Sequence, residues 1–198
     1  MKTVVTPWRD RLLVIDGEDE LPPESLFTEQ ELARSHGFRL HARRAQYLWS
    51  RFAAKEMAIQ RGLAASPLQV TVDRPNLLVN GEATGWFVSV SHSMSLAGAT
   101  ITQAPAGFDV QVIRDLSEQA SHLFLSDDEA EAMRRCSITN RIIHFWSAKE
   151  AAWKQRSGQF ATLRQIPLRL VSEQTTGLTF DSVETLAIGS VVVAITRA

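Results

Sequence analysis

The order of helical and strand-like segments constrains the fold of this chain more than any other feature. Apolar residues, Leu40 among them, recur at helical spacing over residues 33–62, and Gly62 is the expected stop of this helical segment. A second helical region covers residues 126–156: a capping box of Ser126 and Glu129 predicts a short helix through Arg135, and a longer helix is expected to end at residues 157–158. Short β-like runs follow each region, at residues 69–72, 86–90, 96–102, 107–113, 168–171, 178–180 and 191–196. Helix then strands, twice over, predicts an α+β fold with two halves, residues 1–103 and 104–198, without a detectable sequence repeat.

Charged residues are unevenly distributed along a chain that is nearly neutral overall. The 198 residues include 21 Lys or Arg and 22 Asp or Glu, giving a net charge of -1. This balance excludes a whole-protein basic field of the kind that binds nucleic acid. Residues 16–31 nevertheless hold seven acids and no base, and we expect this segment to form a loop. Residues 33–62 hold seven bases and one acid, a local charge of +6. We interpret the basic segment either as a solvated helix face paired with the acidic segment or as a local anion site.

Cysteine content and apolar runs indicate the cellular compartment. Cys136 is the only cysteine, so neither an internal disulfide nor a cysteine zinc cluster is possible. The first residues lack a long apolar core, and no stretch of about 20 residues is free of charge. We therefore expect a cytoplasmic protein without a signal peptide or a membrane span.

The second helical region carries the most informative polar residues. Glu150 and Lys154 are four residues apart, so they share one helix face and can act on one site. A separate apolar face for the core is supplied by Ile138, Ile142, Phe145, Ala148 and Ala152. The alternative is an exposed Glu–Lys pair of small stabilising value.

Two strand segments add further candidates. Asp109 and Gln111 alternate along a predicted strand, so their side chains point to the same side. Such oxygen ligands suit Mg²⁺ when a further carboxylate and phosphate oxygens complete the site. Ser91 and His92 follow another strand, where hydroxyl, imidazole and backbone N–H groups can bind phosphate oxygens. Taken singly, each segment is also compatible with an ordinary strand end or edge.

Taken together, these segments resemble a known family. Ser91-His92-Ser93, Gly107-Phe108-Asp109-Val110 and the string from Trp146 to Lys154 resemble the ordered signature of the 4'-phosphopantetheinyl transferases of the surfactin-synthetase-activating (Sfp) type. The resemblance covers roughly residues 28–158. It implies a monomeric pseudo-dimer of two similar α+β halves, each a long helix on a small, mainly antiparallel sheet, with the active site between them. Such enzymes transfer phosphopantetheine from coenzyme A to a serine of an acyl or peptidyl carrier protein.

The resemblance also implies roles for individual residues. Asp109, Gln111 and Glu150 would hold Mg²⁺, with Glu150 the candidate base and Lys154 neutralising the pyrophosphate. The implied contacts to coenzyme A phosphates come from Arg43, Arg44, Arg74, Ser91, His92 and Lys154. Gln111 stands where many relatives carry an acid, so one negative charge is missing and we expect weaker metal affinity.

Two other functions are compatible with parts of the pattern. A non-catalytic relative that binds coenzyme A or a carrier protein is one, and Gln111 keeps this alternative open. A nucleic-acid module built on the basic helical segment is disfavoured, because the net charge is -1 and no recognition motif is present.

Overall fold

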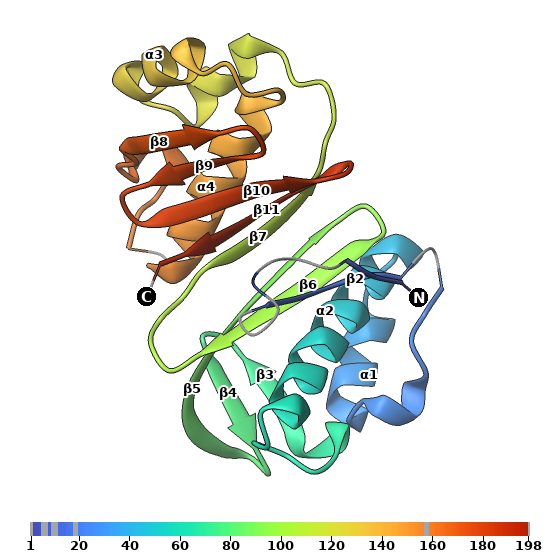
Figure 1. The fold of residues 1–198 in the computed structure, drawn as a ribbon. Helices are drawn as coiled ribbons and strands as arrows, with labels where there is room; N and C mark the ends of the chain where they lie inside the picture. The colour runs from blue at the N-terminus through green and yellow to red at the C-terminus, as the bar shows by residue number, and fades with distance from the viewer. Residues whose placement is uncertain (1, 5–7, 9–11, 18–19, 157–158, 198) are drawn as a thin grey trace. The chain divides into compact units, whose positions relative to one another are not determined.

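The computed structural model describes residues 2–4, 8, 12–17, 20–156 and 159–197 of the chain. It is an α+β structure that divides into two compact units, Met1–Pro105 and Ala106–Ala198 (Figure 1). The sequence places the change between halves after residue 103, and the structure places it after Pro105. In the described part of the chain, no helix is both long and apolar enough to cross a membrane.

The described residues of the N-terminal unit form two α-helices, two short 3₁₀ helices and a six-stranded antiparallel sheet. The α-helices are α1 (Glu29–His36) and α2 (His41–Gln60), and the 3₁₀ helices are Glu24–Leu26 and Pro67–Gln69. In spatial order the strands are β1 (Lys2–Val4), β2 (Leu12–Asp16), β6 (Leu96–Thr102), β5 (Glu82–Ser93), β4 (Asn76–Val79) and β3 (Val70–Asp73). Figure 1 shows α2 lying along this sheet. The core between them includes Trp49, Ala53, Met57, Val88, Ala99 and Ile101.

The C-terminal unit, in its described residues, has α3 (Asp127–Arg135), α4 (Arg141–Gln155) and a five-stranded antiparallel sheet. Its 3₁₀ helices are Glu118–Leu123 and Leu163–Gln165. In spatial order the strands are β7 (Phe108–Val112), β11 (Val191–Thr196), β10 (Val183–Ile188), β9 (Gly177–Phe180) and β8 (Leu170–Gln174). The residues predicted for the apolar face of this long helix are all part of the buried core, although Ile138 precedes α4 and only Ile142, Phe145, Ala148 and Ala152 lie on it.

The predicted continuous helix over residues 33–62 is wrong. Two helices occupy this region, because a Thr28–Glu31 capping box starts α1 at Glu29 and the chain turns at Gly37 before α2 begins. Leu40, expected on the apolar face, is 66% exposed at the N-cap of α2. The predicted stop at Gly62 is confirmed, since this residue has a φ of 70° and the N–H of Leu63 closes onto the carbonyl oxygen of Ala58.

The second helical region is predicted more closely. The capping box of Ser126 and Glu129 is present, and α3 ends at Arg135 as expected. Helix α4 begins after Asn140, which has a φ of 61°, whereas the expected stop at residues 157–158 lies outside the described residues. Four described strands were missed: β1, β4, β10 and β2, which ends at Asp16 inside the segment expected to be a loop.

A fully buried lysine joins the elements of the N-terminal unit. The Nζ atom of Lys55 lies 2.9 Å from Oε2 of Glu31, the capping-box residue of α1. It also donates to the carbonyl oxygens of Pro67 at 2.8 Å and Val70 at 2.9 Å. A charge buried this deeply is tolerated because a carboxylate and two carbonyl groups replace its water.

The C-terminal unit contains the same arrangement. Nζ of the fully buried Lys149 lies 2.7 Å from Oε2 of Glu129, the capping-box residue of α3, and also donates to the carbonyl oxygen of Ile166. In both units the lysine belongs to the long helix and the glutamate to the short helix before it. A residue just after a capped 3₁₀ helix supplies the carbonyl oxygen in each unit.

The two units also share strand order and a short stretch of sequence. The order β2-β6-β5-β4-β3 corresponds to β7-β11-β10-β9-β8. Residues 52–60 and 146–154 align without a gap, and the four identities are Ala54 with Ala148, Lys55 with Lys149, Glu56 with Glu150, and Ala58 with Ala152. Sequence reasoning missed this repetition because it is confined to so few positions.

Candidate functional site

Gly107 allows strand β7 to lie unusually close to helix α4. A Cβ atom at this position would lie only 1.7 Å from the carbonyl oxygen of Ala151 in α4, so a side chain cannot be accommodated. Asp109 therefore enters the sheet directly beside the helix. Only 1% of its surface is exposed.

The Asp109 carboxylate receives hydrogen bonds from three side chains. Lys154 Nζ contacts Oδ1 at 2.8 Å, Ser147 Oγ donates to Oδ2 at 2.9 Å, and Gln111 Nε2 donates to Oδ2 at 3.0 Å. Lys154 also donates to the carbonyl oxygen of Phe108 at 3.1 Å. These hydrogen bonds replace the water that the Asp109 carboxylate loses on burial.

The structure thus brings together the strand and helix residues that the sequence singled out in this unit. Asp109 and Gln111 share one side of β7, as predicted. Ser147 was missed, although its spacing carried the signal. It lies three residues before Glu150 and seven before Lys154, which places all three on one helix face.

Glu150 is half-buried beside this group, and its environment favours the protonated form. Burial raises the pKa of the Glu150 carboxyl above its ordinary value, and the negative charge of Asp109 raises it further, while Lys154 opposes both effects. A carboxylate with a raised pKa accepts a proton more readily near neutral pH than an exposed one does. Glu150 is therefore suited to act as a general base.

The oxygen atoms of this group are the kind that bind Mg²⁺. Asp109 and Glu150 supply carboxylates, and Gln111 can add an amide oxygen if its amide turns, because its nitrogen faces Asp109. Across the described ranges, no group of three or more His, Cys, Asp or Glu could hold a metal ion. The residues fit Mg²⁺ when phosphate and water oxygens complete the coordination, as they commonly do for this ion.

The remaining predicted site residues lie in the N-terminal unit. Ser91 is buried and His92 half-buried on β5, and Arg74 is exposed in the turn between β3 and β4. Arg43 and Arg44 lie in the first turn of α2.

The two arginines of the α2 first turn have different partners. Arg44 forms an ion pair with Glu24 at 2.8 Å and contacts His36 Nε2, also at 2.8 Å. This ion pair confirms, for Arg44, the predicted pairing between the basic segment and the acidic segment. Arg43 is exposed and bonds only weakly, at 3.4 Å, to Gln46.

Arg51 is a cationic residue that sequence reasoning did not select. Its guanidinium lies 3.9 Å from the centre of the Tyr47 ring, and only 7% of the residue is exposed. Burial lowers the pKa of Arg51, and the charges of Arg74 and Arg34 lower it further against the opposing effect of Tyr47. Within the described residues no carboxylate forms an ion pair with Arg51. These three arginines form a local positive cluster. The signal in the sequence was the four-residue spacing of Tyr47 and Arg51, which places both on one helix face.

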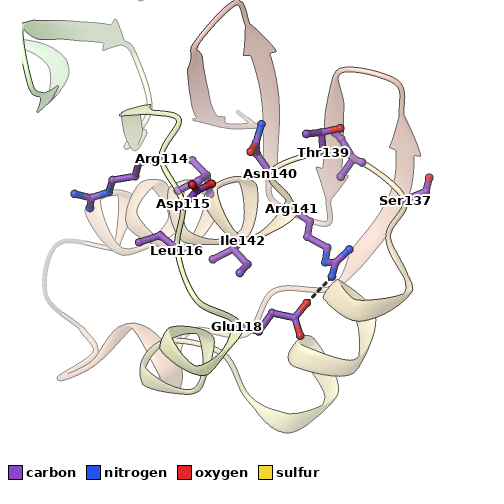
Figure 2. A pocket seen from close by; sticks show the side chains of 11 residues that line it. Arg114, Asp115, Leu116, Glu118, Ser137, Thr139, Asn140, Arg141 and Ile142 are labelled. Atoms are coloured by element: carbon purple, nitrogen blue, oxygen red, sulfur yellow. Dashed lines mark hydrogen bonds and ion pairs between the residues drawn. The ribbon is translucent and has the colours of Figure 1, made fainter.

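A separate depression lies where α4 begins. It has a volume of about 330 Å³ and lies between residues 114–118 and 137–143 (Figure 2). Figure 2 shows Arg141 reaching Glu118, with which it forms an ion pair. None of the predicted site residues lines this depression.

Comparison with protein-family models and with curated proteins gives no match for this chain.

Proposed function

We propose that this protein transfers the 4'-phosphopantetheine group of coenzyme A to a serine hydroxyl of an acyl or peptidyl carrier protein. One observation carries the proposal: the buried carboxylate of Asp109 accepts a hydrogen bond from Lys154, and burial together with the charge of Asp109 raises the pKa of a second carboxyl group, Glu150. Oxygen donors for a divalent cation, a proton acceptor and a cation for developing negative charge are thereby close together. The ordered resemblance to the transferase signature supplies the substrate class.

The proposed chemistry uses each of these groups. The serine hydroxyl attacks the β-phosphorus, a new O–P bond forms, and the bond to adenosine 3',5'-bisphosphate breaks. Glu150 takes the hydroxyl proton, and Lys154 neutralises negative charge on the pyrophosphate. Asp109, Gln111 and Glu150 would hold Mg²⁺, which supplies positive charge to the phosphate oxygens.

The N-terminal unit supplies the proposed phosphate-binding residues. Arg51 and Arg74 belong to one positive cluster, and a phosphate group is a partner that would lower the cost of burying Arg51. Ser91 and His92 are proposed to donate to the same cofactor. Arg43 is accessible at the start of α2, whereas Arg44 must leave Glu24 to take part.

The shared plan of the two units supports the pseudo-dimer fold as part of the proposal. Both units have the same order of five strands, and both clamp a buried lysine of the long helix onto a capping-box glutamate. We propose a cytoplasmic monomer whose cationic residues also attract an acidic carrier protein.

The direct test is a carrier-protein assay. Several apo carrier proteins are incubated with the full chain, coenzyme A and Mg²⁺, and each carrier is weighed by mass spectrometry. The proposal expects the mass gain of one phosphopantetheine, its loss in Glu150→Ala, and its retention in Glu56→Ala, the matched residue of α2. No gain on any carrier contradicts it.

The second candidate function is a non-catalytic protein that binds coenzyme A. The nitrogen of Gln111, and not an acid, faces Asp109, which leaves two carboxylates for a cation. Calorimetry that shows coenzyme A binding, together with no transfer to any carrier, favours this candidate.

A further inference from the structure

The side chain of Lys154 occupies the position on Asp109 that a metal cation would need. Its Nζ atom lies 2.8 Å from Oδ1, and the other oxygen, Oδ2, already accepts hydrogen bonds from Ser147 and Gln111. A divalent cation bound at Asp109 would lie close to the ammonium group. Two cations at one carboxylate repel each other strongly at a site so little exposed to water.

The arrangement of helices and strands that the two units share does not require a lysine at position 154. The residue of α2 that matches Lys154 is Gln60, although the neighbouring Lys55 and Glu56 are kept. Only 17% of the Lys154 side chain is exposed, yet it hydrogen-bonds outward from the helix to the strand and is not part of the apolar core. The lysine therefore serves the Asp109 site and not the arrangement that the two units share.

We infer that Lys154 competes with a divalent cation for Asp109, so that the cation binds well only when a phosphate group draws the ammonium away. The inference rests on the proposed function, whose substrate supplies that phosphate. Phosphate oxygens and the Asp109 carboxylate are alternative partners for one ammonium group. Phosphate and metal binding are then coupled, and each strengthens the other by the same factor.

The experiment measures Mn²⁺ binding by the full chain without any phosphate compound, from the electron paramagnetic resonance signal of free Mn²⁺. In Lys154→Gln the competing charge is gone while a donor to Asp109 remains, so the dissociation constant is expected to fall on the order of tenfold or more. In Lys154→Arg the charge remains and the dissociation constant should stay within about twofold of wild type. Arg156→Gln removes a charge from the same helix end without touching Asp109, and it should also stay within about twofold.

Three results would overturn the inference. Equal affinity in wild type and Lys154→Gln shows that no competition exists. An equal gain in Arg156→Gln assigns the effect to net charge, and no Mn²⁺ binding by any variant removes the cation site. Circular dichroism confirms that each variant is folded, and Lys154→Met replaces Lys154→Gln if the latter is not. Because no carrier protein is present, a failed transfer assay and a failed competition are separate outcomes.

Discussion

Helices α2 and α4 occupy matching places in the two units, yet among the described residues only α4 lies beside a buried carboxylate of its sheet, Asp109. Both carry a buried lysine followed by a glutamate, Lys55-Glu56 and Lys149-Glu150. Around Lys149, α4 adds Ser147 and Lys154, where α2 has Ala53 and Gln60. Strand β7 adds Asp109, whereas the matching strand β2 reads Leu-Leu-Val-Ile before its final Asp16.

The difference separates two kinds of residue in one motif. A buried lysine paired with a capping-box glutamate, Lys55 with Glu31 and Lys149 with Glu129, occurs in both units, and we call it the lysine clamp. The clamp therefore belongs to the frame that holds the short helix, the long helix and a loop together. Ser147, Lys154 and Asp109 occur in one unit only, at positions where the other unit folds with small, neutral or apolar residues. The residues of the proposed chemistry are therefore an addition to a shared frame, and each prediction below tests that separation.

The largest expected effect comes from the clamp. Replacing Lys149 by Met leaves Glu129 buried without its partner, and Lys55→Met does the same to Glu31. Each change should lower the free energy of unfolding by about 3–5 kcal/mol. Unfolding in urea measures both losses.

The same comparison has an internal control. Adding Glu129→Gln to Lys149→Met removes the unpaired charge and should restore a large part of the loss. A loss below about 1 kcal/mol in only one of the two lysine variants contradicts a shared clamp.

The next effect concerns pH and is expected in the C-terminal unit alone. His144 of α4 is fully buried, its Nδ1 atom lies 2.8 Å from Thr185 Oγ1, and burial lowers its pKa to about 4. The matching residue of α2 is Ser50. Since the neutral form is favoured in the folded state, stability is complete above the unfolded pKa and falls as the pH drops from about 6.5 to about 4, by roughly 3 kcal/mol.

Unfolding free energies of the full chain across this pH range check the prediction. His144→Leu should remove this part of the pH dependence, whatever it costs at neutral pH. An unchanged slope between pH 6.5 and 4 in His144→Leu would show that another group titrates.

The smallest effect concerns Ser147, which positions Asp109 without being proposed to touch the substrate. Ser147→Ala removes a hydrogen-bond donor to the carboxylate and should cost about 1 kcal/mol of stability. The transfer rate should fall about tenfold, with KM for coenzyme A little changed, since a misplaced carboxylate affects the reacting geometry. Ser35→Ala in α1, a fully buried serine whose Oγ atom donates to the Leu32 carbonyl oxygen, is the control and should leave transfer unchanged.

Much of the fold follows from local patterns that the sequence displays. The capping box at Ser126, the stop at Gly62 and the apolar face of α4 were all predicted, because each depends on residues within one or two turns. The break near Gly37 was missed, because apolar and basic residues continue across it at helical spacing. Strands β4 and β10 were missed because they depend on neighbouring strands more than on their own sequence.

The candidate site shows the same difference between features set by local sequence and features set by distant contacts. Glu150 with Lys154, and Asp109 with Gln111, were identified from spacing within one element. That Lys154 contacts Asp109, and that Arg51 lies in a positive cluster with Arg74, depends on contacts between elements. Lys149 illustrates the limit best, since only its contacts to Glu129 and Ile166 show that it belongs to the frame and not to the chemistry.

One substitution tests the separation of frame and chemistry most directly. Lys154→Gln gives α4 the residue that α2 carries at the matching position, and phosphopantetheine transfer to an apo carrier protein is measured beside the thermal unfolding of the variant. The account predicts a folded protein with an intact clamp and a transfer rate reduced at least about a hundredfold. A transfer rate within about threefold of wild type would contradict it, because Lys154 would then lie outside the chemistry.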